Sequence, residues 1–246
     1  MTNTSGTSYR LVFQPEGHLL DAARACESEV FLHAYGNTSE DFVREYGPYE
    51  GASHFIALAS ADDEVVGVCR LVFPGPAGLK TVNDVSRPPW NVDGVRATRA
   101  VGADLTSTWD VATLGVLPSR RMPFLGAAAL YHGLVMATRA NDVRWIVMML
   151  DERARRLLAA AGFIAAAIPG TAPAPYLGSE SSTPLVGNVA AMIDVQRRTN
   201  PDAYRLMSLG VGLDGITVPP LSEFVVRASV PAAAQQGGRL ELAKIA

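Results

Sequence analysis

Cysteine and histidine are scarce in this sequence of 246 residues. Only Cys26 and Cys69 are present, too few and too far apart for a disulfide framework or a zinc site, so we predict two reduced, largely buried thiols. The four histidines show no mutual spacing that indicates a metal site or a catalytic dyad. The sequence therefore predicts that no metal is bound.

Long apolar runs are also absent. No stretch approaches the roughly 18 apolar residues of a membrane-spanning helix, and the N-terminus lacks the apolar segment of a secretory signal. We therefore expect a cytoplasmic protein without a membrane span. The formal net charge of −3 gives no reason to expect nucleic-acid binding, and no motif that reads DNA or RNA is present.

Strong catalytic signatures are missing as well. The chain contains no phosphate-binding P-loop, no GxGxxG motif after a strand, no HExxH zinc motif, no GxSxG nucleophile motif and no CxxC pair. Any activity must therefore be inferred from the order of the predicted elements and from shorter patterns.

What the sequence does contain is an ordinary globular composition, 48% hydrophobic and 18% charged. We expect a single domain with a core over about residues 9–196 and a C-terminal extension over 197–246. The clearest unit, residues 108–162, predicts a strand, a long helix after Pro123, a second buried strand and a basic helix from Asp151. Because a helix joins two strands of one sheet, we predict a parallel pair within a mixed α/β fold.

Shorter patterns predict the rest of the chain. Residues 74–107 are rich in proline and glycine with little periodicity, which indicates a long loop that is either functional or disordered. The other predicted elements are a strand at 9–13, a helix up to residue 35, a hairpin of strands 54–59 and 65–73, a strand at 185–196, a short helix at 201–209 and one edge strand within 218–230.

Two basic residues, Arg120 and Arg121, lie in the loop before the long helix of the central unit. Free N–H groups at a helix start attract phosphate, and two guanidinium groups would add charge-assisted bonds. The alternative, which the local sequence alone favours, is a solvated basic turn.

Three stretches of the chain follow a family pattern. Residues 29–58 form an aromatic and acidic segment, EVVGVCRLV carries a G-x-x-R-L pattern that includes Gly67 and Arg70, and DVATLGV lies on an E-x-S-R-x-x-V pattern. Together with the order of elements, they resemble the GNAT acyltransferase superfamily. More narrowly, they resemble its branch of acyl-homoserine-lactone synthases, N-acyl amino acid synthases and exosortase-associated acyltransferases. The resemblance covers about residues 20–165.

This resemblance implies a three-layer αβα fold with a mixed central sheet flanked by helices. It also implies transfer of an acyl group to the amine of a small, amino-acid-derived acceptor, with no permanently bound cofactor. The donor would be acyl-CoA or the phosphopantetheine of an acyl carrier protein. Two alternatives stay open: a relative that uses S-adenosylmethionine, as the signal synthases of this branch do, and an inactive ligand-binding or regulatory protein.

The chain departs from the family pattern at two places. The loop RRMPFLGA keeps Arg121 and Gly126 where the superfamily holds the CoA pyrophosphate, but not the glycine spacing, so the donor is either CoA or a carrier protein. Asp110 stands where the family has Glu, and Thr113 stands where it has Arg. The usual ion pair cannot form there, and we expect a different acceptor from that of the classical quorum-signal enzymes.

The resemblance places catalytic candidates on the central strand. Asp110 either relays the proton of the acceptor amine or binds that amine, and its alternative role is to cap a turn. A backbone N–H near Val116 or Leu117 is the expected donor to the thioester oxyanion. Arg70 either contacts the acceptor carboxylate or faces solvent.

Further substrate-binding candidates, besides Thr113, are aromatic or acidic. They are Tyr49, Trp90 and Trp109, which line an acyl or acceptor pocket or else pack in the core, and Glu45 and Glu50. The two glutamates stand where the family places acidic acceptor-binding residues, and otherwise they are solvated charges on a loop.

Overall fold

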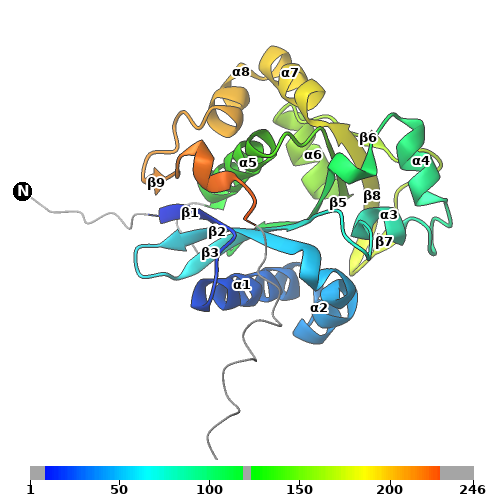
Figure 1. Cartoon of the computed structure of the whole chain (residues 1–246), viewed down its shortest axis with the longest axis horizontal. Helices are drawn as coiled ribbons and strands as arrows, with labels where there is room; N and C mark the ends of the chain where they lie inside the picture. Colours follow the sequence, from blue (N-terminus) through cyan, green and yellow to red (C-terminus); the bar gives the residue numbers. More distant parts are fainter. Residues whose placement is uncertain (1–8, 119–122, 228–246) are drawn as a thin grey trace, which may run out of the picture.

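The computed structural model describes residues 9–118 and 123–227. Within these ranges the strands form one mixed sheet in the order β6-β8-β5-β4-β3-β2-β1-β9, with β7 paired to β8 (Figure 1). The strands are β1 (Tyr9–Phe13), β2 (Ser53–Ser60), β3 (Val65–Val72), β4 (Thr108–Val116), β5 (Trp145–Asp151), β6 (Ala166–Ala167), β7 (Ala174–Tyr176), β8 (Ser179–Asn188) and β9 (Ile216–Thr217). The α-helices are α1 (His18–Tyr35), α2 (Ser39–Tyr46), α3 (Lys80–Asp84), α4 (Gly94–Ala100), α5 (Pro123–Ala140), α6 (Glu152–Ala160), α7 (Val189–Thr199) and α8 (Pro201–Ala203).

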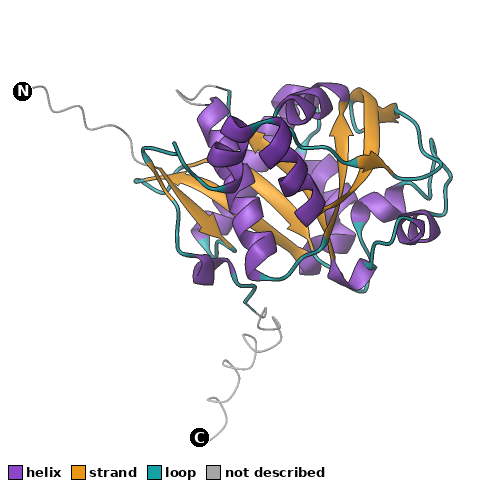
Figure 2. Ribbon diagram, turned by 90° about the horizontal axis from the view of Figure 1, so that it is seen from above, coloured by secondary structure: helices purple, strands orange, loops and turns teal. Residues whose placement is uncertain are grey.

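Helices cover both faces of this sheet. Figure 1 shows α1 and α2 on one face and α5, α6 and α7 on the other, and Figure 2 shows helices crossing in front of the strands. α1 packs on β3 and β4, whereas α5 packs on β1 to β4. The predicted three-layer mixed α/β fold and its parallel β4–β5 pair are confirmed. None of the helices in the described ranges combines the length and the apolar character needed to cross a membrane.

Apolar clusters hold the layers together. Ala23 and Cys26 of α1 pack in one cluster with Phe55 of β2. On the opposite face, Leu130 of α5 packs in a larger cluster that includes Cys69 of β3. Burying a large apolar side chain of this kind contributes about 1.5–3 kcal/mol. Both cysteines are buried thiols, as predicted.

Signals in the sequence set the turn between α1 and α2. Gly36 ends α1 in the left-handed conformation, and its N–H bonds the carbonyl of Leu32. Thr38 then begins α2 with a capping box in which its side chain and that of Asp41 bond each other's backbone N–H groups. This turn fixes the end of α1, including Tyr35, beside the start of α2.

The structure differs from the sequence prediction in three segments. The predicted strand at 185–196 is correct only up to Asn188, because Asn188 caps a helix through the N–H of Ala191 and α7 replaces the strand from Val189 onward. Residues 74–107 are no structureless loop, since they contain α3 and α4. No edge strand lies in the described part of 218–230, residues 218–227, because the strand at that edge of the sheet is β9, which pairs with β1 and ends at Thr217.

A bulge in β4 opens the centre of the sheet. Arg70 pairs with Thr113 and Leu71 pairs with Val111, so Ala112 is an extra residue without a partner in β3. A bulge bends its strand and increases the local twist. On the other side, β4 pairs with β5 only from Thr108 to Val111. Beyond Val111 the two strands separate.

Candidate functional site

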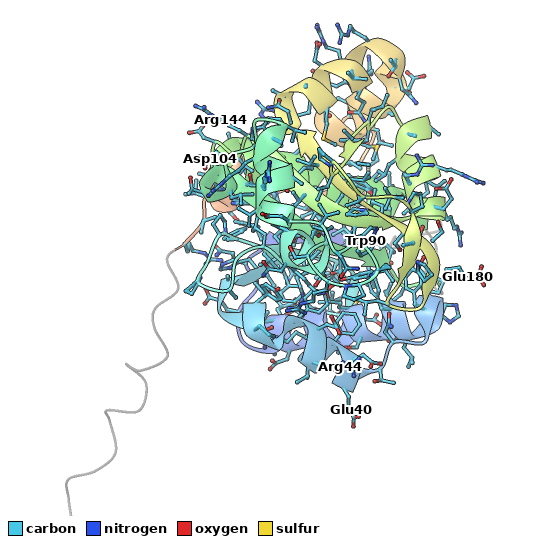
Figure 3. The ribbon with its side chains drawn as sticks, turned by 90° about the vertical axis from the view of Figure 1, so that its right-hand side faces the viewer. Glu40, Arg44, Trp90, Asp104, Arg144 and Glu180 are labelled. Carbon is cyan, nitrogen blue, oxygen red and sulfur yellow. The ribbon has the colours of Figure 1, made fainter. Side chains whose placement is uncertain are left out.

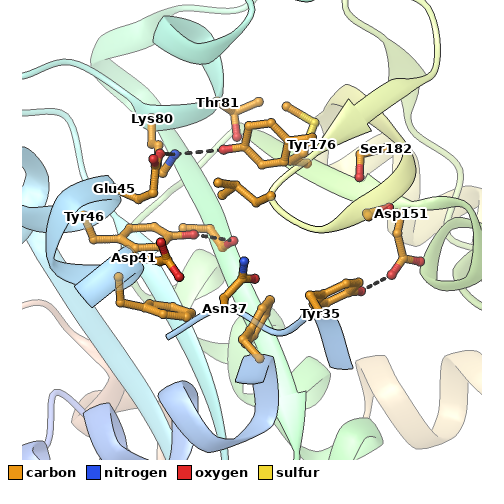
Figure 4. Close-up of a pocket in the computed structure, with 16 residues that line it drawn as sticks. Tyr35, Asn37, Asp41, Glu45, Tyr46, Lys80, Thr81, Asp151, Tyr176 and Ser182 are labelled. Carbon is orange, nitrogen blue, oxygen red and sulfur yellow. Dashed lines mark hydrogen bonds and ion pairs between the residues drawn. The ribbon is translucent and has the colours of Figure 1, made fainter. Parts of the chain in front are cut away.

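A cavity of about 70 Å³ lies on the α1–α2 face of the sheet where β4 and β5 separate (Figure 4). We call it the α2-side cavity. Side chains from α1, α2, α3, β5 and the β7–β8 hairpin surround it, and most of them are polar or aromatic. They include Tyr35, Asn37, Asp41, Phe42, Glu45, Tyr46, Lys80, Thr81, Asp151, Tyr176, Ser179 and Ser182.

A second cavity, of about 120 Å³, lies on the opposite face beneath α5, α6 and α7. We call it the α5-side cavity. Its lining is mainly apolar, which suits a hydrocarbon chain better than a charged group. It includes Val111, Leu114, Tyr131, Leu134, Ile146, Met148, Leu150, Leu158, Phe163 and Met192.

The two cavities meet at the opening between the strands. Both are lined by Phe31, Tyr35, Ala112, Met149 and Asp151. We call these residues the junction. A molecule in one cavity and a molecule in the other would therefore have their nearest atoms at the junction.

The junction side of β4 presents backbone donors. Leu117 donates its N–H to the carbonyl of Val66, 2.9 Å away, so of the two positions predicted for an oxyanion donor, Val116 and Leu117, the second is already engaged within the sheet. Hydrogen-bonded and non-bonded pairs alternate along an antiparallel ladder, and Val116 pairs with Gly67. The N–H groups of Val116 and Leu114 are thus directed away from β3, toward the side from which β5 has diverged.

Asp110 lies beneath α3 rather than at the mouth of a cleft. It is fully buried. Its carboxylate accepts hydrogen bonds from both the backbone N–H and the hydroxyl of Thr81, at 2.5 and 2.9 Å. Burial raises the pKa of Asp110 to about 7. It lines neither cavity, so the structure shows a carboxyl that anchors α3, and its predicted catalytic role is not tested by this placement.

Arg70 forms a buried ion pair instead of facing solvent. Its guanidinium bonds both carboxylate oxygens of Glu27 on α1, at 2.7–3.1 Å. It also bonds Glu50 at 3.1 Å and lies over the ring of Tyr46, 4.5 Å from the centroid. The hydroxyl of Thr113 donates to Glu27. Arg70 and Thr113 therefore meet at Glu27, which the sequence analysis had not singled out.

A second buried cluster surrounds Lys80. Its ammonium group bonds Asp84 at 2.6 Å, the hydroxyl of Tyr176 at 2.8 Å and Glu45 at 3.2 Å. Lys80 is 3% exposed, so each partner offsets the cost of burying its charge. Burial raises the pKa of Tyr176, and the carboxylate of Asp84 raises it further. Glu45, for which the sequence predicts acceptor binding, lines the α2-side cavity.

The aromatic candidates lie outside both cavities. Trp109 is buried in the core and stacks on Phe73 with 4.1 Å between ring centroids. Trp90 donates its indole N–H to the carbonyl of Ala172 at 2.6 Å, which ties the α3–α4 loop to the segment before β7 (Figure 3). Tyr49 is also buried. Tyr49 and Trp109 pack in the core, which is the alternative that the sequence left open, whereas Trp90 is only partly buried. A pocket-lining role for these residues stays a prediction.

Only part of the predicted phosphate-binding loop lies within the described residues. Arg120 and Arg121 lie outside the described residues. Gly126 lies in α5, where an added Cβ would stand 3.1 Å from Leu58 and 3.3 Å from Val116. Its missing side chain therefore lets α5 approach β2 and β4 closely. Glu50 lines neither cavity but a groove between α1 and α2, where it pairs with Arg24. Phe42 and Tyr46 line both this groove and the α2-side cavity.

Tyr35 and Asp151 form a pair at the junction that the sequence analysis missed. The hydroxyl of Tyr35 donates to one carboxylate oxygen of Asp151, and the other oxygen caps α6 through the N–H of Ala154 at 2.6 Å. The sequence signal for Asp151 was that of a helix cap alone. Lys80 and Asp84 were missed because their four-residue spacing lay in a segment interpreted as loop.

Metal ligands are not grouped in the described residues. No cluster of three or more His, Cys, Asp or Glu side chains there is placed to hold a metal ion.

Sequence comparison gives no match, whereas solved structures share the fold. No family model and no curated protein matches the chain. FeeM, an N-acyl amino acid synthase from uncultured soil microbes, is 13% identical with a TM-score of 0.59, over 77% of this chain and 96% of FeeM. BjaI, a CoA-dependent acyl-homoserine lactone synthase solved with SAM and isopentyl-CoA, is 14% identical with a TM-score of 0.55, over 89% and 97%. The AHL synthase LasI is 12% identical with a TM-score of 0.52, over 75% of this chain and 91% of LasI. The fold expected from the resemblance is confirmed.

Proposed function

We propose that this protein is an N-acyltransferase that moves an acyl group from a thioester to the amine of a small acceptor. One observation carries the proposal: an apolar cavity and an acidic cavity approach each other from opposite faces of the sheet and meet at a junction. Acyl transfer needs this arrangement, because the acyl carbon and the amine must be held in contact while the rest of each substrate stays apart. The fold shared with acyl-transferring synthases supports it.

The α5-side cavity would hold the acyl chain of the donor. Its apolar lining matches a hydrocarbon, and the N–H groups of Leu114 and Val116 would donate to the thioester carbonyl as charge develops on its oxygen. The donor is acyl-CoA or an acylated carrier protein. Arg120 and Arg121, with the start of α5 and Gly126, would hold the donor's phosphate groups.

The α2-side cavity would hold the acceptor. Asp41, Glu45 and Asp151 line it, and Lys80 is the one cation among its described lining residues. The backbone N–H of Thr38 lowers the pKa of Asp41 to about 2, so this carboxylate stays ionised at neutral pH. The acidic lining attracts an ammonium group.

An amino-acid-derived acceptor would also bring a carboxylate. Lys80 would receive it. The bond from Lys80 to Glu45, at 3.2 Å, is the longest of the three bonds to its ammonium group, and the acceptor carboxylate would replace it.

A second candidate is a reaction that uses S-adenosylmethionine. The aromatic rings of Phe42 and Tyr46, next to the carboxylates of Asp41 and Glu45, would suit a sulfonium cation. BjaI was solved with this compound.

Thiol release separates these functions. The protein would be incubated with acyl-CoA and acylated carrier protein of several chain lengths and a panel of amines and amino acids, with mass spectrometry of the amide product. We expect acceptor-dependent thiol release, and none with any combination would refute the N-acyltransferase. Calorimetric binding of S-adenosylmethionine without thioester turnover would favour the second candidate. Ligand binding without any turnover would indicate a regulatory protein.

A further inference from the structure

Transfer of an acyl group to an amine requires movement of protons as well as positioning. An acceptor enters as an ammonium ion and must lose a proton before its nitrogen can attack, and the departing thiolate must gain one. A group that serves both steps must be reached from the acceptor side and from the donor side. Among the described residues, those of the junction meet that condition, since they line both cavities.

Within the junction, the chemistry singles out two residues. Phe31, Ala112 and Met149 carry no titratable group, whereas Tyr35 and Asp151 do. They come from the last turn of α1 and the last position of β5, and they bond each other directly. The structure thus brings a carboxylate and a phenol, distant in sequence, to the point where the substrates would touch (Figure 4).

Both side chains are held in position by contacts outside the cavities. One oxygen of Asp151 is engaged by the N–H of Ala154, so the carboxylate cannot rotate freely and its other oxygen stays toward Tyr35. Tyr35 is held at its backbone by the β7–β8 turn, where a Cβ on Gly178 would come within 2.4 Å of the Tyr35 carbonyl. Such preorganisation lowers the cost of reaching the reactive geometry.

The protonation states suit a relay. Burial raises the pKa of Tyr35, and the bond to Asp151 raises it further. The phenol therefore keeps its proton at neutral pH and holds it in the hydrogen bond to Asp151. Asp110, by comparison, has both oxygens bonded to Thr81 and lines neither cavity.

We propose that Asp151 and Tyr35 are the proton relay of the acyl transfer, an inference that rests on the proposed function. Asp151 takes one proton from the acceptor ammonium, and the neutral amine attacks the thioester carbon to form the C–N bond. The tetrahedral intermediate collapses with cleavage of the C–S bond. The proton lost by its nitrogen passes through the Tyr35 hydroxyl to the thiolate, and Asp151 releases the first proton to solvent. The products are an amide, a thiol and one proton.

The test separates this role from structural anchoring. Asp151→Asn keeps a good helix cap while removing the charge, and Tyr35→Phe removes only the hydroxyl. With an acyl donor and an amine that the parent uses, we expect kcat/KM at pH 7 to fall about 10²–10⁴-fold in Asp151→Asn and to fall in Tyr35→Phe. In Asp151→Asn the rate should recover as pH rises toward the pKa of the free amine, because the substrate then arrives without its proton.

Matched controls lie elsewhere in the chain. Asp93 caps α4 through the N–H of Arg96 just as Asp151 caps α6, so Asp93→Asn should leave the rate and its pH profile unchanged, as should Tyr204→Phe. Parent-like rates and pH profiles in both Asp151→Asn and Tyr35→Phe, with an active parent, would overturn the relay alone. A parent inactive with every thioester and amine would overturn the proposed function and the relay together.

Discussion

The carboxylate of Glu27 on α1 and the guanidinium of Arg70 on β3 form an ion pair, 2.7 Å from Oε2 to Nη2, in which both side chains are almost fully buried. This contact joins the helix layer to the sheet directly below the α2-side cavity, because Tyr46 lies over the same guanidinium.

Removing one member of this pair should destabilise the protein. Glu27→Gln leaves the buried guanidinium with the partly exposed Glu50 as its remaining counter-ion, and the free energy of unfolding should fall by up to about 3–5 kcal/mol in urea denaturation. Glu29→Gln, at an exposed position on the same helix, is the control and should change it by less than about 0.5 kcal/mol. A normal stability with a raised acceptor KM would instead support the sequence prediction that Arg70 binds substrate.

Asp110 should affect stability and its pH dependence. Its pKa in the folded chain, about 7, is above the ordinary value because burial disfavours the charge, and the nearby Asp84 adds to this while Lys80 opposes it. The folded state therefore binds this proton more tightly than the unfolded state does. The stabilisation that results from protonated Asp110 is complete below about pH 4 and is lost as the pH rises to about 7. Asp110→Asn should flatten that part of the stability profile in denaturation at several pH values.

The same variant decides the catalytic prediction made from the sequence. A proton relay at Asp110 would lower kcat/KM by about 10²–10⁴-fold on replacement by Asn, with an unchanged melting temperature. Activity per folded molecule near that of the parent would remove Asp110 from the catalytic candidates.

Lys80 should distinguish two classes of acceptor. If an acceptor carboxylate binds its ammonium group, Lys80→Met removes a charged hydrogen bond of about 1.5–3 kcal/mol and should raise the KM of an amino acid by roughly 10–100-fold. The matching amine without a carboxylate serves as the control substrate and should show a smaller change. Equal changes for the two acceptors would argue against carboxylate recognition at Lys80.

Arg120 and Arg121 should bind the donor. Replacing both by Ala should raise the donor KM or weaken carrier-protein binding, by about 1.5–3 kcal/mol for each charged bond lost, and added salt should mimic part of the effect. Arg155 and Arg156, exposed on α6, provide a double-alanine control of equal charge. Unchanged donor affinity would support the alternative interpretation that Arg120 and Arg121 belong to a solvated turn.

Acyl-chain preference should follow the size of the α5-side cavity. Leu134 lines it from α5, so Leu134→Phe should reduce its volume and shift the ratio of kcat/KM values toward shorter acyl donors. One methylene in an apolar pocket is worth about 1–3 kcal/mol. Leu157→Phe, on an exposed part of α6, should leave the ratio unchanged.

Local patterns predicted most of the sheet but not the short helices. The β2–β3 hairpin and the β4–α5–β5 unit rest on periodicity within a few residues, so they were visible in the sequence. α3 and α4 are too short to be stable by themselves. Thr81 is held by Asp110, far along the chain, and that contact has no local signature.

The candidate site was harder to predict for the same reason. Glu45 followed from the family pattern, whereas Tyr35 and Asp151 become neighbours only when α1 and β5 are assembled on one sheet. Trp109 was a candidate for lining a pocket, with packing in the core as its alternative. A strand alternates its faces, and this ring turns into the core beneath α5.

Ala112 interrupts the alternation of β4 side chains between the two faces of the sheet, and it also bends the strand. The side chains that face α5 are odd-numbered before it, at Trp109 and Val111, and even-numbered after it, at Leu114 and Val116. Deleting this one residue would leave Val111 opposite Leu71 and Thr113 opposite Arg70, so it would restore a continuous ladder and keep each side chain on its present face. The hydroxyl of Thr113 would still be directed toward Glu27, but the bend of β4 would be lost and the opening in the sheet would close. A single inserted residue thus changes the shape of the sheet without changing which side chains meet each helix layer, so this position should tolerate substitution far better than deletion.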